Sequence, residues 1–177
     1  MHNQEREHAM RDDNRIVREF EWGTEYITDH LNGDDPRKLF SLYSKNTLEH
    51  SEDFFSSPEI SDFKFEISNN EEKLIWNSGV KTISPENNTA YARYFPHETN
   101  KKSAVLVLPH WNAKAGTYYD LCKIFNKVGL SALRLTLPYH EERMPPECDR
   151  ADYLVAPNVG RTLQSLRQAV VDTRSAV

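Results

Sequence analysis

Two short apolar runs, each followed by a polar loop, organise the second half of the chain. Ala104–Leu108 and Leu130–Leu137 are largely apolar, which is typical of strands buried on both faces of a parallel sheet. Between them, Thr117–Val128 has apolar residues at helical spacing, and Gly129 follows as a C-terminal cap. Strand, helix and strand joined by short loops predict a right-handed parallel βαβ unit.

Three strand-like segments precede this unit, at Asp62–Ser68, Lys73–Trp76 and Thr89–Phe95. The first alternates polar with apolar residues, which predicts a strand with one buried face. Its apolar residues are Phe63, Phe65 and Ile67. Turn-forming residues at 84–88 separate the second segment from the third. We therefore expect the sheet to begin with antiparallel strands.

The amino-terminal part of the chain predicts helices. Apolar residues recur at roughly helical spacing over Ile16–Leu31, with Gly23 as a weak point. Asp35 before Pro36 suits the N-cap and first position of a second helix, Pro36–Asn46. We expect these two helices to form a helical hairpin. Residues 1–14 are polar and charged, and we expect them to be frayed.

A final amphipathic helix is predicted from Arg161 to Val177. The apolar residues that define its packing face are Leu163, Leu166, Val170 and Val177. Composition changes at 56–58, so we expect a helical extension over residues 1–55 and a second unit over residues 56–177. The expected fold class is α/β, with a sheet that starts antiparallel, continues as a parallel βαβ unit and follows a helical hairpin.

Charge and composition narrow the function classes. The chain has 177 residues and a net charge of −5, and its Lys and Arg are scattered, so we expect no nucleic-acid partner. No segment approaches the roughly 18 consecutive apolar residues of a membrane span, and the start has no apolar leader segment, so we expect a cytoplasmic protein. Cys122 and Cys148 have no metal-ligand spacing and are expected to be reduced thiols. We expect no cofactor.

The polar loops after the two buried strands are the strongest pointer to a site. In open α/β sheets, ligands bind beyond the carboxyl ends of the strands. The first loop carries His110, Trp111 and Asn112. The second loop runs from Tyr139 to Arg143. Because the two strands are expected to be parallel, both loops should emerge at the same edge of the sheet.

These loops resemble those of the α/β-hydrolase family. Leu-Pro-His-Trp-Asn at 108–112 is similar to the His-Gly loop after the third strand of that family. Leu-Pro-Tyr-His-Glu-Glu-Arg-Met-Pro at 137–145 resembles the loop that lines the pocket entrance, and 87–96 is similar to the second strand. The resemblance covers about residues 60–177. It implies the amino-terminal part of a serine esterase or acyl hydrolase, ending before the nucleophile elbow.

The resemblance assigns a role to the first loop. In the family, one N–H of the oxyanion hole comes from this loop and the other from the residue after the nucleophile. Carried over by position, Asn112 is the expected donor, with Trp111 adjacent. Trp111 stands where the family often has Gly, which limits the backbone freedom of the loop. The alternative is that His110 and Asn112 cap the following helix.

The second loop offers further candidates. Tyr139 and His140 are expected to line the pocket or order the loop, and His140 is a less favoured acid–base group. Arg143 is expected either to bind a substrate carboxylate or to pair with Glu147 or Asp149. A metal triad of His110, His140 and Glu142 is a further alternative, although neither the HExxH pattern nor any helical ligand spacing supports it.

No residue of the chain fits the role of nucleophile. The six glycines do not bracket Ser or Cys in a Gly-x-Ser-x-Gly elbow. The chain ends inside an amphipathic pattern, and in the family the strand at Ala104–Leu108 would have a further neighbour, without which it is an exposed edge. We expect the sequence to be truncated.

Three functional hypotheses follow. The first is the amino-terminal part of an α/β-hydrolase that acts on a small ester or acyl substrate, supplies the oxyanion loop and is inactive alone. The second is a non-catalytic interaction domain whose open strand edge is covered by a partner or by a second copy of the chain. The third is a metal-assisted hydrolase that uses the two histidine loops.

Overall fold

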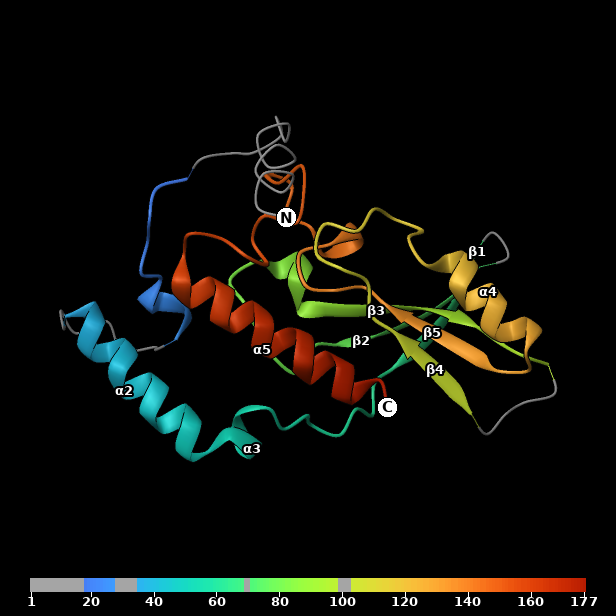
Figure 1. Cartoon of the computed structure of the whole chain (residues 1–177), viewed down its shortest axis with the longest axis horizontal. Coiled ribbons are helices and arrows are strands. Elements are labelled where there is room, and N and C mark those ends of the chain that lie inside the picture. Colours follow the sequence, from blue (N-terminus) through green and yellow to red (C-terminus); the bar gives the residue numbers. More distant parts are fainter. Residues whose placement is uncertain (1–17, 28–34, 69–70, 99–102) are drawn as a thin grey trace, which may run out of the picture.

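The computed structural model describes residues 18–27, 35–68, 71–98 and 103–177. Its centre is a five-stranded open sheet in the order β1-β2-β3-β5-β4 (Figure 1). The strands are β1 (Lys64–Ser68), β2 (Glu71–Asn77), β3 (Thr89–Phe95), β4 (Ala104–Val107) and β5 (Ser131–Leu135). The α-helices are α2 (Pro36–Glu49), α3 (Ser51–Phe54), α4 (Tyr119–Lys127) and α5 (Val159–Ser175).

Strand directions confirm the expected change within the sheet. β1, β2, β3 and β5 pair antiparallel in that order, whereas β4 and β5 are parallel and are joined in the chain through α4. Ala92 of β3 lies opposite Leu135, and Val107 of β4 lies opposite Arg134. The mixed α/β class is thus confirmed. In the part of the chain that is described, no helix combines the length and apolar character needed to cross a membrane.

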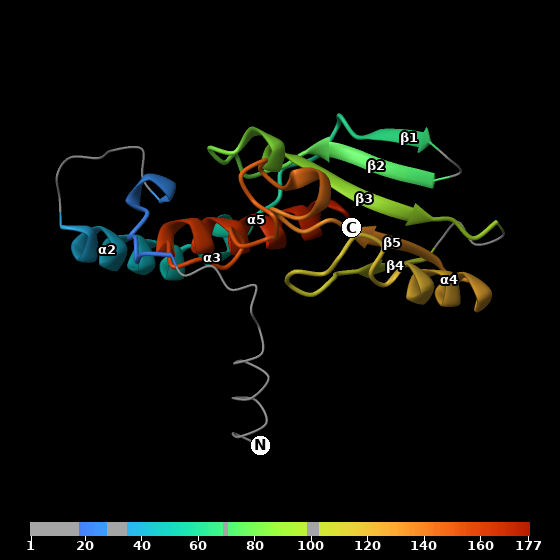
Figure 2. The ribbon, with the colours of Figure 1, turned by 90° about the horizontal axis from the view of Figure 1, so that it is seen from above.

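The two faces of the sheet carry separate apolar clusters. On one face, Cys122 and Phe125 of α4 pack with Val107 and Ala132. On the other face, the core consists of Trp76, Ala90, Ala92, Leu133 and Leu135. Ala176, directly after α5, packs against this second cluster. Figure 2 shows α4 close to β4 and β5, while α5 extends away from the strands toward α2 and α3.

A buried polar network fastens α5 to the sheet. Arg143 and Asp172 are both fully buried and form an ion pair at 2.8 Å. The other Asp172 oxygen accepts a hydrogen bond from the Ser78 hydroxyl at 2.7 Å. One turn earlier on α5, the Gln168 amide donates to Ser78 and to the carbonyl of Asn87. The buried face of α5 is therefore polar as well as apolar, which the sequence pattern did not indicate.

The predicted helix over Ile16–Leu31 is wrong where it can be tested. Residues 18–27 contain only a 3₁₀ turn at Thr24–Tyr26, and the rest of the predicted helix lies outside the described residues, so no helical hairpin is shown. A Cβ on Gly160 would lie 1.8 Å from the Gly23 carbonyl oxygen, a close approach that requires glycine. Backbone hydrogen bonds join this segment to the start of α5: Glu21 with Pro157 and Val159, and Trp22 with Gly160.

The second predicted helix is confirmed and is three residues longer than expected. α2 begins at Pro36, and the Asp35 carboxylate accepts a hydrogen bond from the Arg37 amide at 3.0 Å, as expected for an N-cap. α2 and α3 pack beside α5 rather than beside a helix at 16–31 (Figure 1). Two arginines of α5 support this packing: Arg167 and Arg174 donate to the carbonyls of Phe54 and Phe55.

Two apolar faces differ from their predicted burial. Leu163, Leu166 and Val170 of α5 remain 37–48% exposed and line a groove with α2 and α3, because Ser165, Gln168 and Asp172 occupy the buried face. The side chains at and just before β1 that were expected to be buried are exposed instead: Phe63, Phe65 and Ile67. β1 is an edge strand that pairs with β2 on one side.

Candidate functional site

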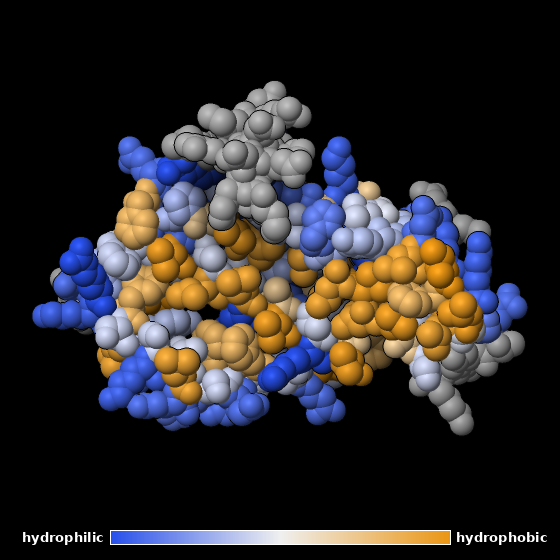
Figure 3. Space-filling view, in the orientation of Figure 1, coloured by the Kyte–Doolittle hydropathy of each residue, from blue (hydrophilic) through white to orange (hydrophobic). Residues whose placement is uncertain are grey.

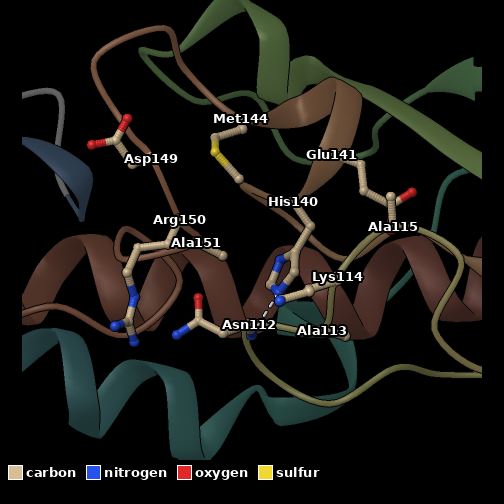
Figure 4. A pocket seen from close by; sticks show the side chains of 10 residues that line it. All are labelled: Asn112, Ala113, Lys114, Ala115, His140, Glu141, Met144, Asp149, Arg150 and Ala151. Carbon is tan, nitrogen blue, oxygen red and sulfur yellow. Dashed lines mark hydrogen bonds between the residues drawn. The ribbon is translucent and has the colours of Figure 1, made fainter. Parts of the chain in front are cut away.

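The loops that follow β4 and β5 meet at the edge of the sheet, as predicted. The backbone N–H of Asn112 donates a hydrogen bond to Nε2 of His140 at 3.0 Å (Figure 4). This contact joins residues 28 positions apart in the sequence. It forms because β4 and β5 are parallel neighbours, so the loops after them leave the sheet in the same direction.

A cavity of about 500 Å³ lies where these loops meet. Figure 4 shows side chains from three loop segments around it: Asn112 after β4, His140 after β5, and Arg150 before α5. The full lining is Asn112, Ala113, Lys114, Ala115, His140, Glu141, Met144, Asp149, Arg150 and Ala151. The volume falls within the range typical of small-molecule pockets.

His140 is held as a neutral imidazole. Its ring is 2% exposed, and Nδ1 lies 2.9 Å from the Pro138 carbonyl oxygen. Because a carbonyl oxygen only accepts, Nδ1 carries the proton and Nε2 is left free to accept from Asn112. Burial lowers the pKa of His140, and the charges of Arg134 and Arg143 lower it further. Neutral His140 is therefore an acceptor built into the loop.

Left-handed backbone conformations cluster around the cavity. In the described part of the chain, four non-glycine residues have a positive φ, and all four lie in or beside the two loops: Asn112, Tyr118, Tyr139 and Glu141. Such conformations cost about 1–3 kcal/mol each and persist only where the surroundings hold them. Both loops are thus held in strained conformations, a feature that commonly marks functional sites.

The other predicted residues of the first loop flank the cavity. His110 Nδ1 and the Tyr118 hydroxyl are hydrogen-bonded at 2.9 Å. Trp111 Nε1 donates to the Ala151 carbonyl at 2.9 Å, and the Arg150 guanidinium lies over the Trp111 ring at 5.7 Å. The alternative role of His110 and Asn112 as helix caps is wrong, because α4 begins at Tyr119, its N-cap is Tyr118, and no side chain caps it. Trp111 instead fixes the segment that carries Arg150.

Tyr139 and Arg143 lie behind the cavity rather than in its lining. Tyr139 is 1% exposed, and its backbone N–H donates to Asn87 Oδ1 at 3.0 Å. Arg143 pairs with Asp172 rather than with Glu147 or Asp149, and its guanidinium also donates to the carbonyls of Thr136 and Asn87. These residues hold the loop after β5 in place.

Two acidic residues in the loop after β5 have cationic partners. Glu141 pairs with Arg134 at 2.6 Å, and Glu142 pairs with Lys73. Burial, the largest single cause, raises the pKa of Glu142, but the hydrogen bond from Lys73, a backbone hydrogen bond and the charges of Lys73 and Arg134 together lower the pKa overall. Within the described residues, no three His, Cys, Asp or Glu side chains gather as a metal site, and the triad considered from the sequence does not form.

The segment 149–151 completes the cavity and was missed by the sequence reasoning. From the sequence, Asp149 was considered only as a possible partner of Arg143, and Arg150 was not considered. One signal for this segment was available in the sequence. The connection between β5 and α5 is long, and a long connection must pack near the edge of the sheet. Its contact with the Trp111 side chain could not be derived from spacing.

Neither cysteine is placed to act in the cavity. Cys122 is fully buried in α4, and burial raises its pKa. Burial also raises the pKa of Cys148, and the neighbouring Glu147 raises it further. The residues that line the cavity include no Ser, Thr or Cys. The described site therefore offers donors and acceptors but no nucleophile.

Comparison with known proteins identifies no relative: no protein-family model and no curated protein sequence matches the chain.

The backbone conformation of Asn112 gives a test of the loop geometry. Its φ is 58°, a region in which a residue with a Cβ is strained and glycine is not. We expect Asn112→Ala to be about 1 kcal/mol less stable than Asn112→Gly, measured by urea unfolding of both variants. Equal stabilities, or a more stable alanine variant, would contradict the left-handed conformation.

Proposed function

We propose that this chain forms the substrate-binding and oxyanion-loop part of an α/β-hydrolase that acts on a small carboxylic ester or another acyl compound. The strand arrangement supports the proposal. Strands β2, β3, β5 and β4 follow the 1-2-4-3 order of the first four strands of that family, with an antiparallel strand before the parallel pair. The topology therefore agrees with the loop resemblance, which was drawn from sequence alone.

The contact between the two loops is the observation that carries the proposal. The resemblance names the Asn112 N–H as the oxyanion donor, and this N–H points to an acceptor, His140 Nε2, beside the cavity. A preorganised N–H at such a position stabilises negative charge on a substrate oxygen, and one such donor is worth about 3 kcal/mol of transition-state stabilisation. In the proposed function, a substrate carbonyl oxygen shares this N–H with Nε2 in a three-centre hydrogen bond, so the His140 contact still positions the donor.

The cavity also offers groups that orient a ligand. Asn112 Oδ1 is buried and has no hydrogen-bond partner among the described residues, so a ligand donor or solvent would satisfy it. The wall carries charges of both signs, because Lys114 and Arg150 are balanced by Glu141 and Asp149, and Arg150 also pairs with Asp152 at 2.9 Å. With no hydroxyl or thiol in the lining, the described site binds and polarises a carbonyl but does not form an acyl-enzyme.

Binding of a carbonyl compound tests this proposal. Butyrophenone has the carbonyl of an acyl substrate and no cleavable bond. We expect it to shift the amide NMR signals of Asn112, Ala113 and Ala151. Ala115→Trp fills the cavity from an exposed position and should weaken binding about tenfold or more, whereas Lys45→Trp on α2 should leave it unchanged. Shifts confined to the groove between α2 and α5 would contradict the proposal.

Hydrolysis provides the second arm of that test. The 177-residue chain should leave p-nitrophenyl butyrate at its spontaneous rate, because no nucleophile lines the cavity. Burst release of nitrophenol in proportion to the chain would contradict this assignment of the site.

A second candidate function, self-association, is favoured by the outer edge of the sheet. In the described part of the chain, β4 pairs only with β5, so its other edge presents unpaired backbone groups. Figure 3 shows apolar side chains gathered over α4 and β4. On α4 the exposed apolar residues are Leu121, Ile124 and Val128. We propose that a second copy of the chain covers this surface.

Charge on α4 is what favours a second copy over another partner. Asp120 lies in the first turn of α4, where it also pairs with Lys123 of the same helix at 3.1 Å, and Lys127 lies in the last turn. A two-fold interface in which β4 pairs antiparallel with β4 would set the two α4 helices antiparallel. Asp120 of each copy then faces Lys127 of the other, while the apolar residues pack between them.

This interface predicts a specific response to mutation. Ile124→Lys places a charge in the centre of the apolar surface and should shift the chain to a monomer in analytical ultracentrifugation. Leu48→Lys, a matched change at an exposed leucine of α2, should leave the dimer intact. A wild-type chain that remains monomeric at high concentration would rule out the interface.

A further inference from the structure

We propose that His140 is a positioning residue whose neutral ring holds the Asn112 amide, and that protonation of His140 releases the loop after β4. The importance of this contact for substrate binding rests on the proposed function. The contact itself is observed independently of that function. Under this proposal, the binding geometry of the cavity depends on the charge of one buried side chain, that of His140.

Two hydrogen bonds fix the state of the ring. Nδ1 donates to the Pro138 carbonyl, which can only accept, and Nε2 accepts from the Asn112 N–H. A protonated ring would turn Nε2 into a donor that faces the Asn112 donor at 3.0 Å. Two donors at that distance repel, so the contact exists only with neutral His140.

The surroundings of His140 favour the neutral form. Arg134 approaches from β5, Arg143 from the loop after β5, and His110 from the loop after β4. Glu141, the nearest acidic neighbour in sequence, is engaged with Arg134. Burial is the largest cause that lowers the pKa of His140; the hydrogen bond to the Pro138 carbonyl acts in the opposite direction, and with these three basic groups the pKa is lowered overall. Because the pKa of His140 is lowered, the contact is complete at neutral pH and is lost as the pH falls below the ordinary range of histidine.

The adjacent Trp111 side chain is held by the Ala151 carbonyl, but the backbone of Asn112 itself depends on the His140 contact. The Asn112 backbone is in the left-handed region, the Asn112 Oδ1 has no partner among the described residues, and the next N–H, of Ala113, returns to His110 within the loop itself. The His140 contact is thus the link that ties Asn112 to the loop after β5. Without it, the strain at Asn112 favours relaxation to another conformation.

NMR of the full chain without ligand tests the proposal. At neutral pH, imidazole ¹⁵N shifts should place the proton of His140 on Nδ1. On acidification, the Asn112 amide signal should move with the same midpoint as the His140 ring. A proton on Nε2 at neutral pH, or an Asn112 amide that stays fixed while His140 titrates, would overturn the proposal.

Variants separate positioning from a merely structural role. His140→Gln keeps a neutral acceptor, so the Asn112 amide should stay near its wild-type position and lose its pH dependence, whereas His140→Phe should shift it at every pH. If acid unfolds the chain before His140 titrates, the ring shifts at neutral pH still decide the question. If the Asn112–His140 contact is intact but butyrophenone does not bind, the proposed function alone is refuted. If butyrophenone still binds when the contact is lost, the inference about His140 alone is refuted.

Discussion

The buried ion pair between Arg143 and Asp172 is the interaction on which the arrangement of this chain depends. Neither side chain reaches solvent. Removing two charges from water costs several kcal/mol per ion, so such a pair persists only with further hydrogen bonds. Ser78 supplies one to Asp172, and the carbonyls of Thr136 and Asn87 accept from Arg143. Breaking a pair of this kind by removing one partner typically costs about 3–5 kcal/mol.

These contacts converge from distant parts of the chain. α5, the end of β2, the turn before β3 and the loop after β5 all meet at the same network. Asn87 extends it toward the site, since its Oδ1 accepts from the Tyr139 N–H, next to His140. His140 in turn accepts from Asn112. A continuous series of polar contacts therefore links α5 to the wall of the cavity.

Sequence patterns predicted the parts of this structure that depend on local signals. Continuous apolar runs identified β4 and β5, and Asp35 before Pro36 identified the start of α2. The failures share one physical cause, because they depend on distant partners. The buried face of α5 is set by Ser165, Gln168 and Asp172, whose partners lie on other elements. Within residues 18–27, Glu21 and Trp22 pair with the start of α5 instead of lying in a helix.

The site shows the same difference between features set by local signals and features set by distant partners. The parallel strands predicted that the two loops would emerge at the same edge of the sheet, and the structure places Asn112 and His140 in the lining of one cavity there. Spacing could not indicate that Trp111 would contact Ala151, or that Arg143 would turn inward to Asp172. Both contacts arise from the long connection between β5 and α5. The sequence indicated which polar groups each loop carries, but it did not indicate which distant residues hold the loop in place.

Hydrogen exchange of an Asp172→Asn variant tests most directly whether the buried pair holds the site together. The variant keeps the size of the side chain and removes its charge, and it would be measured under conditions in which circular dichroism shows it folded. If the network fixes the two loops, the amides of Asn112, Tyr139 and Arg143 exchange faster together, while those of β1 and β2 keep their rates. Faster exchange confined to α5, with both loops still protected, would contradict that dependence.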